Sequence, residues 1–171
     1  MTREEIKSIV RQGSGTLDFE LSSDAFKTSL PQNIYKPILN WTTGERETDI
    51  DKLVTDYITD CVNSFLSLDR DKFIERLKED IFRFFNICIE AASYGQVPDE
   101  LVTKHGNTEA NRIFFKGHDK ESVYSNCKFH YVYYTNDSGP KLRFSIHIKI
   151  DWDMEHGLTI FFENGKYVNI E

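Results

Sequence analysis

The clearest pattern of apolar and polar positions lies in the middle of the chain. From about Thr48 to Leu66, apolar residues recur three and four positions apart, as on the buried face of an α-helix. Thr48 or Asp49 can cap this helix. A second helix is predicted from about Asp69 to Ser93, and Gly95 supplies its stop. Two amphipathic helices with so short a link are expected to form a hairpin or to lie side by side on a sheet.

The second half of the chain is rich in β-branched and aromatic residues, which favour strands. After a polar loop around Lys104 to Thr108, candidate strands run over 112–116, 122–135, 141–152, 157–163 and 166–170. Asn136 to Pro140 is a strong turn signal, and Asn164-Gly165 is the strongest short hairpin signal. The chain is therefore expected to end in an antiparallel meander.

The pattern near the N-terminus is weaker. Arg3 to Arg11 can form a short helix, and the next apolar residues, Leu17, Phe19 and Leu21, alternate with polar ones as in a half-buried strand. Two prolines then interrupt the segment from Leu30 to Trp41, so an irregular stretch is expected there. We expect this stretch to be pinned to the core by Ile34, Tyr35, Ile38, Leu39 and Trp41.

These elements predict one α+β domain over residues 1–171, with two long amphipathic helices packed on a C-terminal antiparallel β-meander. An N-terminal strand and irregular segment occupy 1–47, the helix pair 48–93 and the antiparallel sheet 110–171. The length of 171 residues suits a single compact domain with a substantial core.

Composition narrows the classes of partner. The formal net charge is −7, which argues against nucleic acid and anionic membranes, because both require clustered Lys and Arg. A basic or neutral protein partner is compatible with this charge. The N-terminus is charged where a signal peptide needs apolar residues, and no apolar segment is long enough to span a membrane, so a cytoplasmic location is expected. The three cysteines are far apart and form no C-x-x-C pair.

The densest chemistry lies in one short stretch, Asp151 to Leu158, which carries three carboxylates, an imidazole and an indole. Such residues are typical of a tight turn, in which Asp153 and Glu155 accept backbone N–H bonds and Gly157 supplies an unusual backbone angle. The alternative is a small metal-dependent hydrolase in which a bound ion generates the nucleophilic water. Its candidate ligands are Asp151, Asp153, Glu155 and His156. The spacing of an EF-hand is not met, because position six is His156 rather than glycine.

In the predicted strand before this stretch, apolar and polar residues alternate strictly. One set of its residues should face the helices, namely Phe144, Ile146, Ile148, Ile150 and Trp152. The other face would place His147, Asp151 and Asp153 in a row. Residues on the same face lie roughly 7 Å apart. They can therefore share one ion only if a bulge or a turn folds the row inward.

An aromatic run from Phe129 to Tyr134 also offers two faces. Simple alternation groups Phe129, Tyr131 and Tyr133 on one face, and the other three residues on the opposite face. One aromatic row is then left partly exposed unless both faces are covered. Tyrosine is enriched in protein interfaces, so Tyr131 and Tyr133 are candidate contact residues, with core filling as the alternative.

The string W-D-x-E-H-G-L, from Trp152 to Leu158, is followed by Asn164-Gly165-Lys166 in a short hairpin. This ending resembles the C-terminal signature of a group of uncharacterised bacterial domains, several of which are associated with polymorphic-toxin neighbourhoods and are read as immunity-like proteins. The resemblance covers about the last third of the chain. It implies a toxin-neutralising role and implies no catalytic role for any residue.

Two functions therefore follow from the sequence. The first is a non-enzymatic protein-binding module, of the immunity type, that neutralises a basic toxin. Its candidate binding residues are Trp152, Asp153, Glu155, His156, Tyr131 and Tyr133. The second is the metal-dependent hydrolase. The chain has no G-x-S-x-G, H-E-x-x-H, P-loop or G-x-G-x-x-G motif, which favours the first function, and no cofactor is expected.

Overall fold

A computed structural model describes the chain apart from residues 92–95, 137–138 and 151, and for 153–156 it describes the backbone alone. The helices of the described part are α1 (Arg3–Ile9), α2 (Ile50–Leu53), α3 (Asp56–Leu66), the 3-10 turn η1 (Arg70–Lys72), α4 (Ile74–Ala91), α5 (Asp99–His105), α6 (Asn107–Phe114) and α7 (Lys120–Ser125). Among them, no helix is both long and apolar enough to cross a membrane.

The main sheet has seven strands in the order β1-β2-β3-β6-β7-β8-β9. These are β1 (Arg11–Gln12), β2 (Thr16–Ser23), β3 (Thr28–Tyr35), β6 (Lys128–Tyr134), β7 (Arg143–Ile150), β8 (Asp153–Glu163) and β9 (Lys166–Ile170). Neighbouring strands are antiparallel except for β3 and β6, which are parallel. A separate hairpin consists of β4 (Ile38–Asn40) and β5 (Glu45–Arg46). The fold is therefore α+β with a mostly antiparallel sheet, as the sequence predicts.

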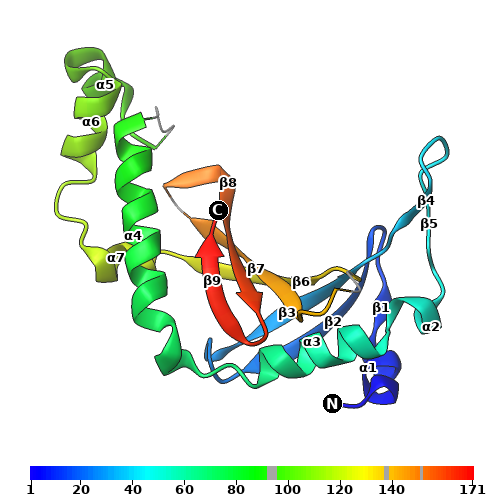
Figure 1. Ribbon diagram of the computed structural model, residues 1–171. Helices are drawn as coiled ribbons and strands as arrows, with labels where there is room; N and C mark the ends of the chain where they lie inside the picture. The colour runs from blue at the N-terminus through cyan, green and yellow to red at the C-terminus, as the bar shows by residue number, and fades with distance from the viewer. Residues whose placement is uncertain (92–95, 137–138, 151) are drawn as a thin grey trace.

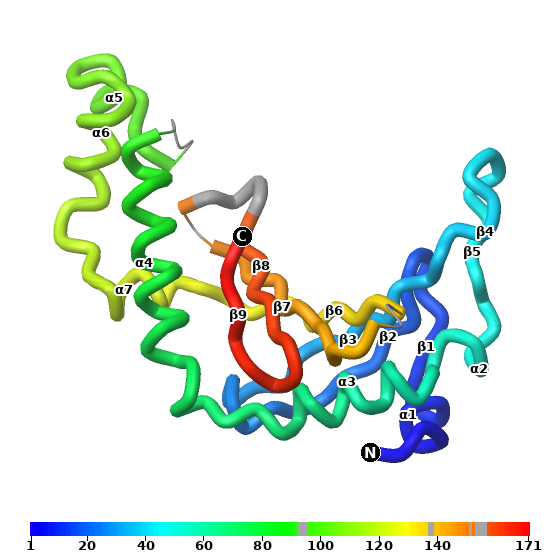
Figure 2. Tube along the Cα trace, in the orientation of Figure 1, coloured from blue at the N-terminus to red at the C-terminus, as the bar shows by residue number. Residues whose placement is uncertain are grey.

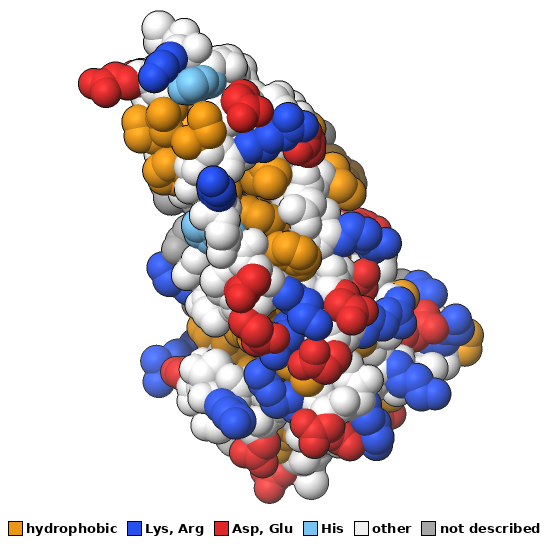
Figure 3. All heavy atoms as spheres, turned by 90° about the vertical axis from the view of Figure 1, so that its left-hand side faces the viewer, with side chains coloured by type: hydrophobic (Ala, Val, Ile, Leu, Met, Phe, Trp, Pro, Cys, Tyr) orange, Lys and Arg blue, Asp and Glu red, His pale blue; other side chains and the backbone are white. Residues whose placement is uncertain are grey.

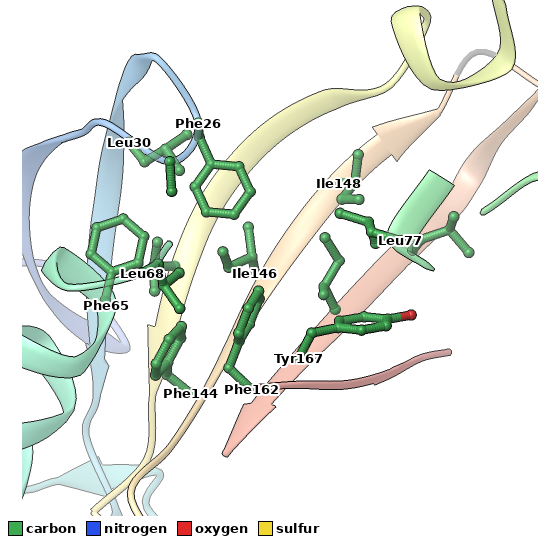
Figure 4. Packing of buried hydrophobic residues seen from close by; sticks show 14 of the residues in the cluster. Phe26, Leu30, Phe65, Leu68, Leu77, Phe144, Ile146, Ile148, Phe162 and Tyr167 are labelled. Atoms are coloured by element: carbon green, nitrogen blue, oxygen red, sulfur yellow. The ribbon is translucent and has the colours of Figure 1, made fainter. Parts of the chain in front are cut away.

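Helices α3 and α4 cover one face of this sheet, and α5 to α7 lie outside α4 (Figure 1). The contact is aromatic: Phe65 of α3 meets Phe144 edge-on at 5.9 Å between ring centroids, and Phe73 meets Phe162 at 5.3 Å. Figure 4 shows Phe144, Ile146 and Phe162 pointing from the sheet toward the helices. The apolar set predicted for the strand over 141–152 is buried in full, so that prediction is confirmed for Phe144, Ile146, Ile148, Ile150 and Trp152.

The prediction of two long helices is not confirmed. The apolar pattern over 48–66 is split, because Asp49 caps α2 and Thr55 starts α3, where its hydroxyl accepts the N–H of Ile58 at 3.2 Å. The pattern over 69–93 begins with a 3-10 turn, and the regular helix α4 starts only at Ile74. A side-chain cap inside a periodic stretch gives the chain a new helix start without disturbing the apolar spacing.

The strands predicted over 112–116 and from 122 are wrong, and so is the loop around 104–108. Helices α5 and α6 occupy most of 99–114, and the strand β6 begins only at Lys128. Asp119 caps α7, where its carboxylate accepts the N–H of Ser122 at 2.8 Å and the Ser122 hydroxyl accepts the N–H of Asp119. A short apolar run such as Ile113 to Phe115 fits the end of a helix as well as a strand, so periodicity alone does not separate them.

The sheet is also not confined to 110–171, because β1 to β3 from the N-terminal part extend it. The irregular segment predicted over 30–41 begins as strand β3, which tolerates Pro31 at a point where it pairs with β2 but not yet with β6. Two of the five residues expected to pin this segment are exposed. Leu39 is 58% exposed and Trp41 is 82% exposed on the β4–β5 hairpin.

Candidate protein-interaction surface

The face of the sheet that points away from α3 and α4 is called the open face here. It carries Tyr35 of β3, Tyr131 and Tyr133 of β6, Ser145 and His147 of β7, and Phe161 of β8. No helix of the described residues packs on it in Figure 1. These side chains are half-buried by one another.

A bulge in β6 decides which aromatic residues reach the open face. Phe129 pairs with Ile148 and Tyr131 pairs with His147, so His130 is an extra residue between two pairs. Phe129 therefore points into the core, where its ring lies 4.6 Å from that of Phe26. The predicted grouping of Phe129 with Tyr131 and Tyr133 is wrong for this reason. The placement of Tyr131 and Tyr133 together on one face is confirmed.

Four rings form a continuous row across three strands, which we call the aromatic row: His147, Tyr131, Tyr133 and Tyr35. His147 and Tyr131 stack with ring centroids 5.1 Å apart and planes 20° apart. Tyr131 and Tyr133 follow at 6.3 Å, and Tyr133 and Tyr35 at 6.1 Å. These separations lie within the range of favourable aromatic pairs. The row therefore presents a fixed, preorganised set of rings.

The aromatic row is uncharged near neutral pH. Burial, followed by His130 and Lys149, lowers the pKa of His147, and burial followed by Lys149 lowers the pKa of His130. Both shifts favour the neutral imidazole. Burial first, then Tyr35 and Tyr131, raises the pKa of Tyr133, which keeps its hydroxyl protonated. The centre of the open face is thus polar at its tips but carries no charge.

Gly157 of β8 makes room for the end of this row. Its φ angle is +67°, a left-handed value that favours glycine, which confirms the unusual backbone angle predicted for this residue. The predicted tight turn is not found at this position, because Gly157 lies within strand β8. A Cβ atom there would lie 2.6 Å from the Ile148 carbonyl oxygen and 3.0 Å from Cε1 of His147. The His147 ring therefore rests against the backbone of β8, which holds it in place beside Tyr131.

A hollow of about 400 Å³ lies at the other end of the open face, between β6 and β9. Its lining includes Tyr133, Ser145, Phe161 and Asn169. Glu163 at its edge pairs with Lys141 at 2.7 Å and with Arg143 at 3.2 Å. The open face is therefore concave next to the aromatic row, with charged groups confined to the border.

The β4–β5 hairpin projects beside the open face and is called the hairpin arm here (Figure 1). Arg46 on the arm lies over the ring of Tyr35, with 5.4 Å from Cζ to the ring centroid. This cation–π contact joins the arm to the end of the aromatic row. The turn of the arm leaves the side chain of Trp41 almost fully exposed. A nearly fully exposed indole is an unusual surface feature and a common anchor in protein interfaces.

A second apolar surface lies on the helices. Figure 3 shows hydrophobic side chains gathered over the upper part of α4 to α6, while acidic and basic side chains alternate below them. The exposed residues there include Ile87 at 58%, Ile113 at 38% and Phe114 at 39%. Below this apolar surface, the helices carry ion pairs such as Lys78–Glu121 at 2.8 Å. This surface lacks the ordered stacking of the aromatic row.

The stretch from 151 to 156 gives no site geometry, since Asp151 and the side chains of Asp153, Glu155 and His156 lie outside the described residues. Their roles as metal ligands or binding residues stay predictions. Elsewhere in the described part, no group of three His, Cys, Asp or Glu side chains could hold a metal ion.

Trp152 is 3% exposed and packs on Phe85 at 5.3 Å between ring centroids. Its predicted place on the face of the sheet that meets the helices is therefore confirmed. A side chain this deeply buried has no surface with which to touch a partner, so the structure does not support Trp152 as a binding residue.

Sequence reasoning missed Tyr35, Trp41 and Arg46 as parts of the surface. Tyr35 and Trp41 were assigned to the core because large aromatic residues are usually buried. The parallel β3–β6 pairing, which brings Tyr35 beside Tyr133, joins residues about 100 positions apart in sequence. No local pattern encodes that contact.

Comparison with known families gives one match. The family described as "Domain of unknown function (DUF6985)" matches residues 15–171, which include the whole aromatic row and the hairpin arm. No curated protein and no solved structure matches the chain.

Proposed function

We propose that this chain, which belongs to the DUF6985 family, is a non-enzymatic module that binds a basic protein partner on the open face of its sheet. One observation carries the proposal: an ordered, uncharged aromatic row lies on a sheet face that no helix of the described residues covers. An antiparallel sheet can leave one face to water, but that face is then normally polar. Three tyrosines in a row are better explained by a partner.

The composition of the open face suits the centre of a protein interface. Such centres are depleted in charged residues and enriched in Tyr, Trp and Arg. Tyr131 and Tyr133 offer large apolar rings with hydroxyl tips, and they are already held by their neighbours, so little side-chain freedom is lost on binding. Trp41 on the hairpin arm supplies a further anchor at the border.

The net charge of −7 favours a partner of opposite sign. Attraction between a protein of net negative charge and a basic partner speeds association, and salt screens it over about 10 Å at 0.1 M ionic strength. The resemblance of the Trp152 to Leu158 string to immunity-like domains suggests what this partner is. We propose a basic toxin, which the module neutralises by covering it.

The proposal is tested by co-expressing this chain with each candidate toxin encoded near its gene. We expect growth to be protected by one of them. The purified pair should bind more weakly as salt is raised, mainly through slower association. Absence of protection, together with absence of measurable binding at low salt for every candidate, would rule out the toxin-neutralising function.

A further inference from the structure

A hollow of about 540 Å³ lies between the Gly13-Ser14 turn and the hairpin arm. The turn connects β1 to β2, and Figure 2 shows it next to the chain that leaves β3 for β4. Lys36 and Arg46 both line this hollow, and no acidic residue of the described part of the chain does. The concentration of positive charge is unexpected, because the chain has 28 acidic residues against 21 basic ones.

Lys36 is the more unusual of the two cations, since its side chain is 3% exposed. Its Nζ donates to Oε1 of Gln12 at 2.5 Å and to the carbonyl oxygen of Gly13 at 2.7 Å. Both acceptors are neutral, and no carboxylate of the described residues lies within ion-pair distance. An ammonium group in the interior is costly unless a negative charge balances it. The third N–H of Lys36 has no protein acceptor among the described residues.

Arg46 stands beside Lys36 and is held in position by two contacts. Its Nη1 donates to the carbonyl oxygen of Lys36 at 2.8 Å, and its Cζ lies over the Tyr35 ring. The guanidinium lies close to the β1–β2 turn, since a Cβ built on Gly15 would be in ordinary van der Waals contact with the Arg46 Cζ at 4.0 Å. A guanidinium has five N–H donors, and only one is used by the described protein groups. The remaining donors are free to bind a ligand.

We propose that this pocket binds an oxyanion, the phosphate or carboxylate group of a ligand. The guanidinium of Arg46 would bind two oxygens of the ligand side by side. The positive charge of Lys36, which has no acidic partner in the pocket, would be balanced by the negative charge of the ligand. Ser14 and Thr48 line the same hollow, and a hydroxyl group of either residue is a potential further donor. This inference rests on the cations alone and is independent of the proposed toxin-neutralising function.

The test is a titration of the intact protein with inorganic phosphate, and separately with acetate, at constant ionic strength. The thermal midpoint should rise by about 3 to 6 °C when the anion reaches roughly ten times its dissociation constant. A rise with phosphate alone identifies a phosphate group as the ligand. An equal rise with acetate identifies a carboxylate, such as an acidic side chain of a bound protein. No rise with either anion, relative to chloride, overturns the proposal.

Matched variants test whether the anion binds in this pocket. Arg46→Gln should weaken anion binding at least about tenfold, because a charge-assisted hydrogen bond is lost. Arg11→Gln removes the same charge from exposed β1 outside the pocket and should leave the affinity unchanged. Lys36→Met should abolish the response, and Arg46→Gln keeps the test decisive if Lys36→Met does not fold. Equal losses in Arg46→Gln and Arg11→Gln would mean general electrostatics rather than a site, and would overturn the proposal.

Discussion

Phe162→Ala is expected to lower the free energy of unfolding by about 3 to 5 kcal/mol, as is typical when a buried Phe is truncated. The side chain is 1% exposed. Its ring stacks on Phe144 at 5.1 Å and meets Phe73 edge-on at 5.3 Å, so it links the sheet to the segment between α3 and α4. The cavity left by its removal would lie in the layer that Figure 4 shows. Denaturant unfolding measures the loss.

The neighbouring residue Phe161 provides the control, because it lies one position earlier in β8 and faces the opposite side of the sheet. Phe161→Ala should cost about 1 kcal/mol or less, since its ring is half-exposed on the open face. Equal losses in the two variants would mean that both faces of β8 are covered. The open face would then not be free to receive a partner.

Trp41→Ala is expected to weaken binding of the protein partner by about 30-fold, the effect of losing an interfacial hot spot of about 2 kcal/mol. The free energy of unfolding should stay nearly the same, because the indole is 82% exposed and contributes little to the core. Calorimetric titration measures the affinity, and denaturant unfolding measures the stability.

Thr42→Ala is the matched control in the same turn, since it shortens an exposed neighbour and leaves the turn backbone in place. It should change neither quantity. An unchanged affinity in Trp41→Ala would exclude the hairpin arm from the interface. A large loss of stability in that variant would mean that the indole packs on the protein itself.

The C-terminal half of the sheet could be predicted because its signals are local. Asn164 and Gly165 have φ angles of +49° and +71°, which suit the tight hairpin turn that their sequence predicts. The alternation of Phe144, Ile146 and Ile148 likewise follows from the two-residue period of a strand with one buried face. In each case a few adjacent residues contain the whole signal.

The features that the sequence did not predict depend on long-range contacts or on a β-bulge, and neither is visible in the local pattern of apolar and polar residues. The bulge at His130 reverses the side on which Phe129 lies, and a single extra residue leaves no mark on the apolar pattern. The Ile113 to Phe115 run lies in and just beyond a helix because Ala110 and its neighbours pack against α4, which is a tertiary effect. The exposure of Trp41 follows from the separate β4–β5 hairpin, which the chain forms after it leaves β3.

The binding site that we propose on the open face is tested by measuring the affinity of the Tyr131→Ser, Tyr133→Ser double variant for the partner. The comparison is Ile87→Ser, on the exposed surface of α4. All proteins should first be shown to unfold cooperatively. We expect the double variant to lose at least about 100-fold in affinity, which corresponds to roughly 3 kcal/mol shared by two central contacts, and Ile87→Ser to bind normally. Normal binding by the double variant, with weakened binding by Ile87→Ser, would contradict the account and place the interface on the helices.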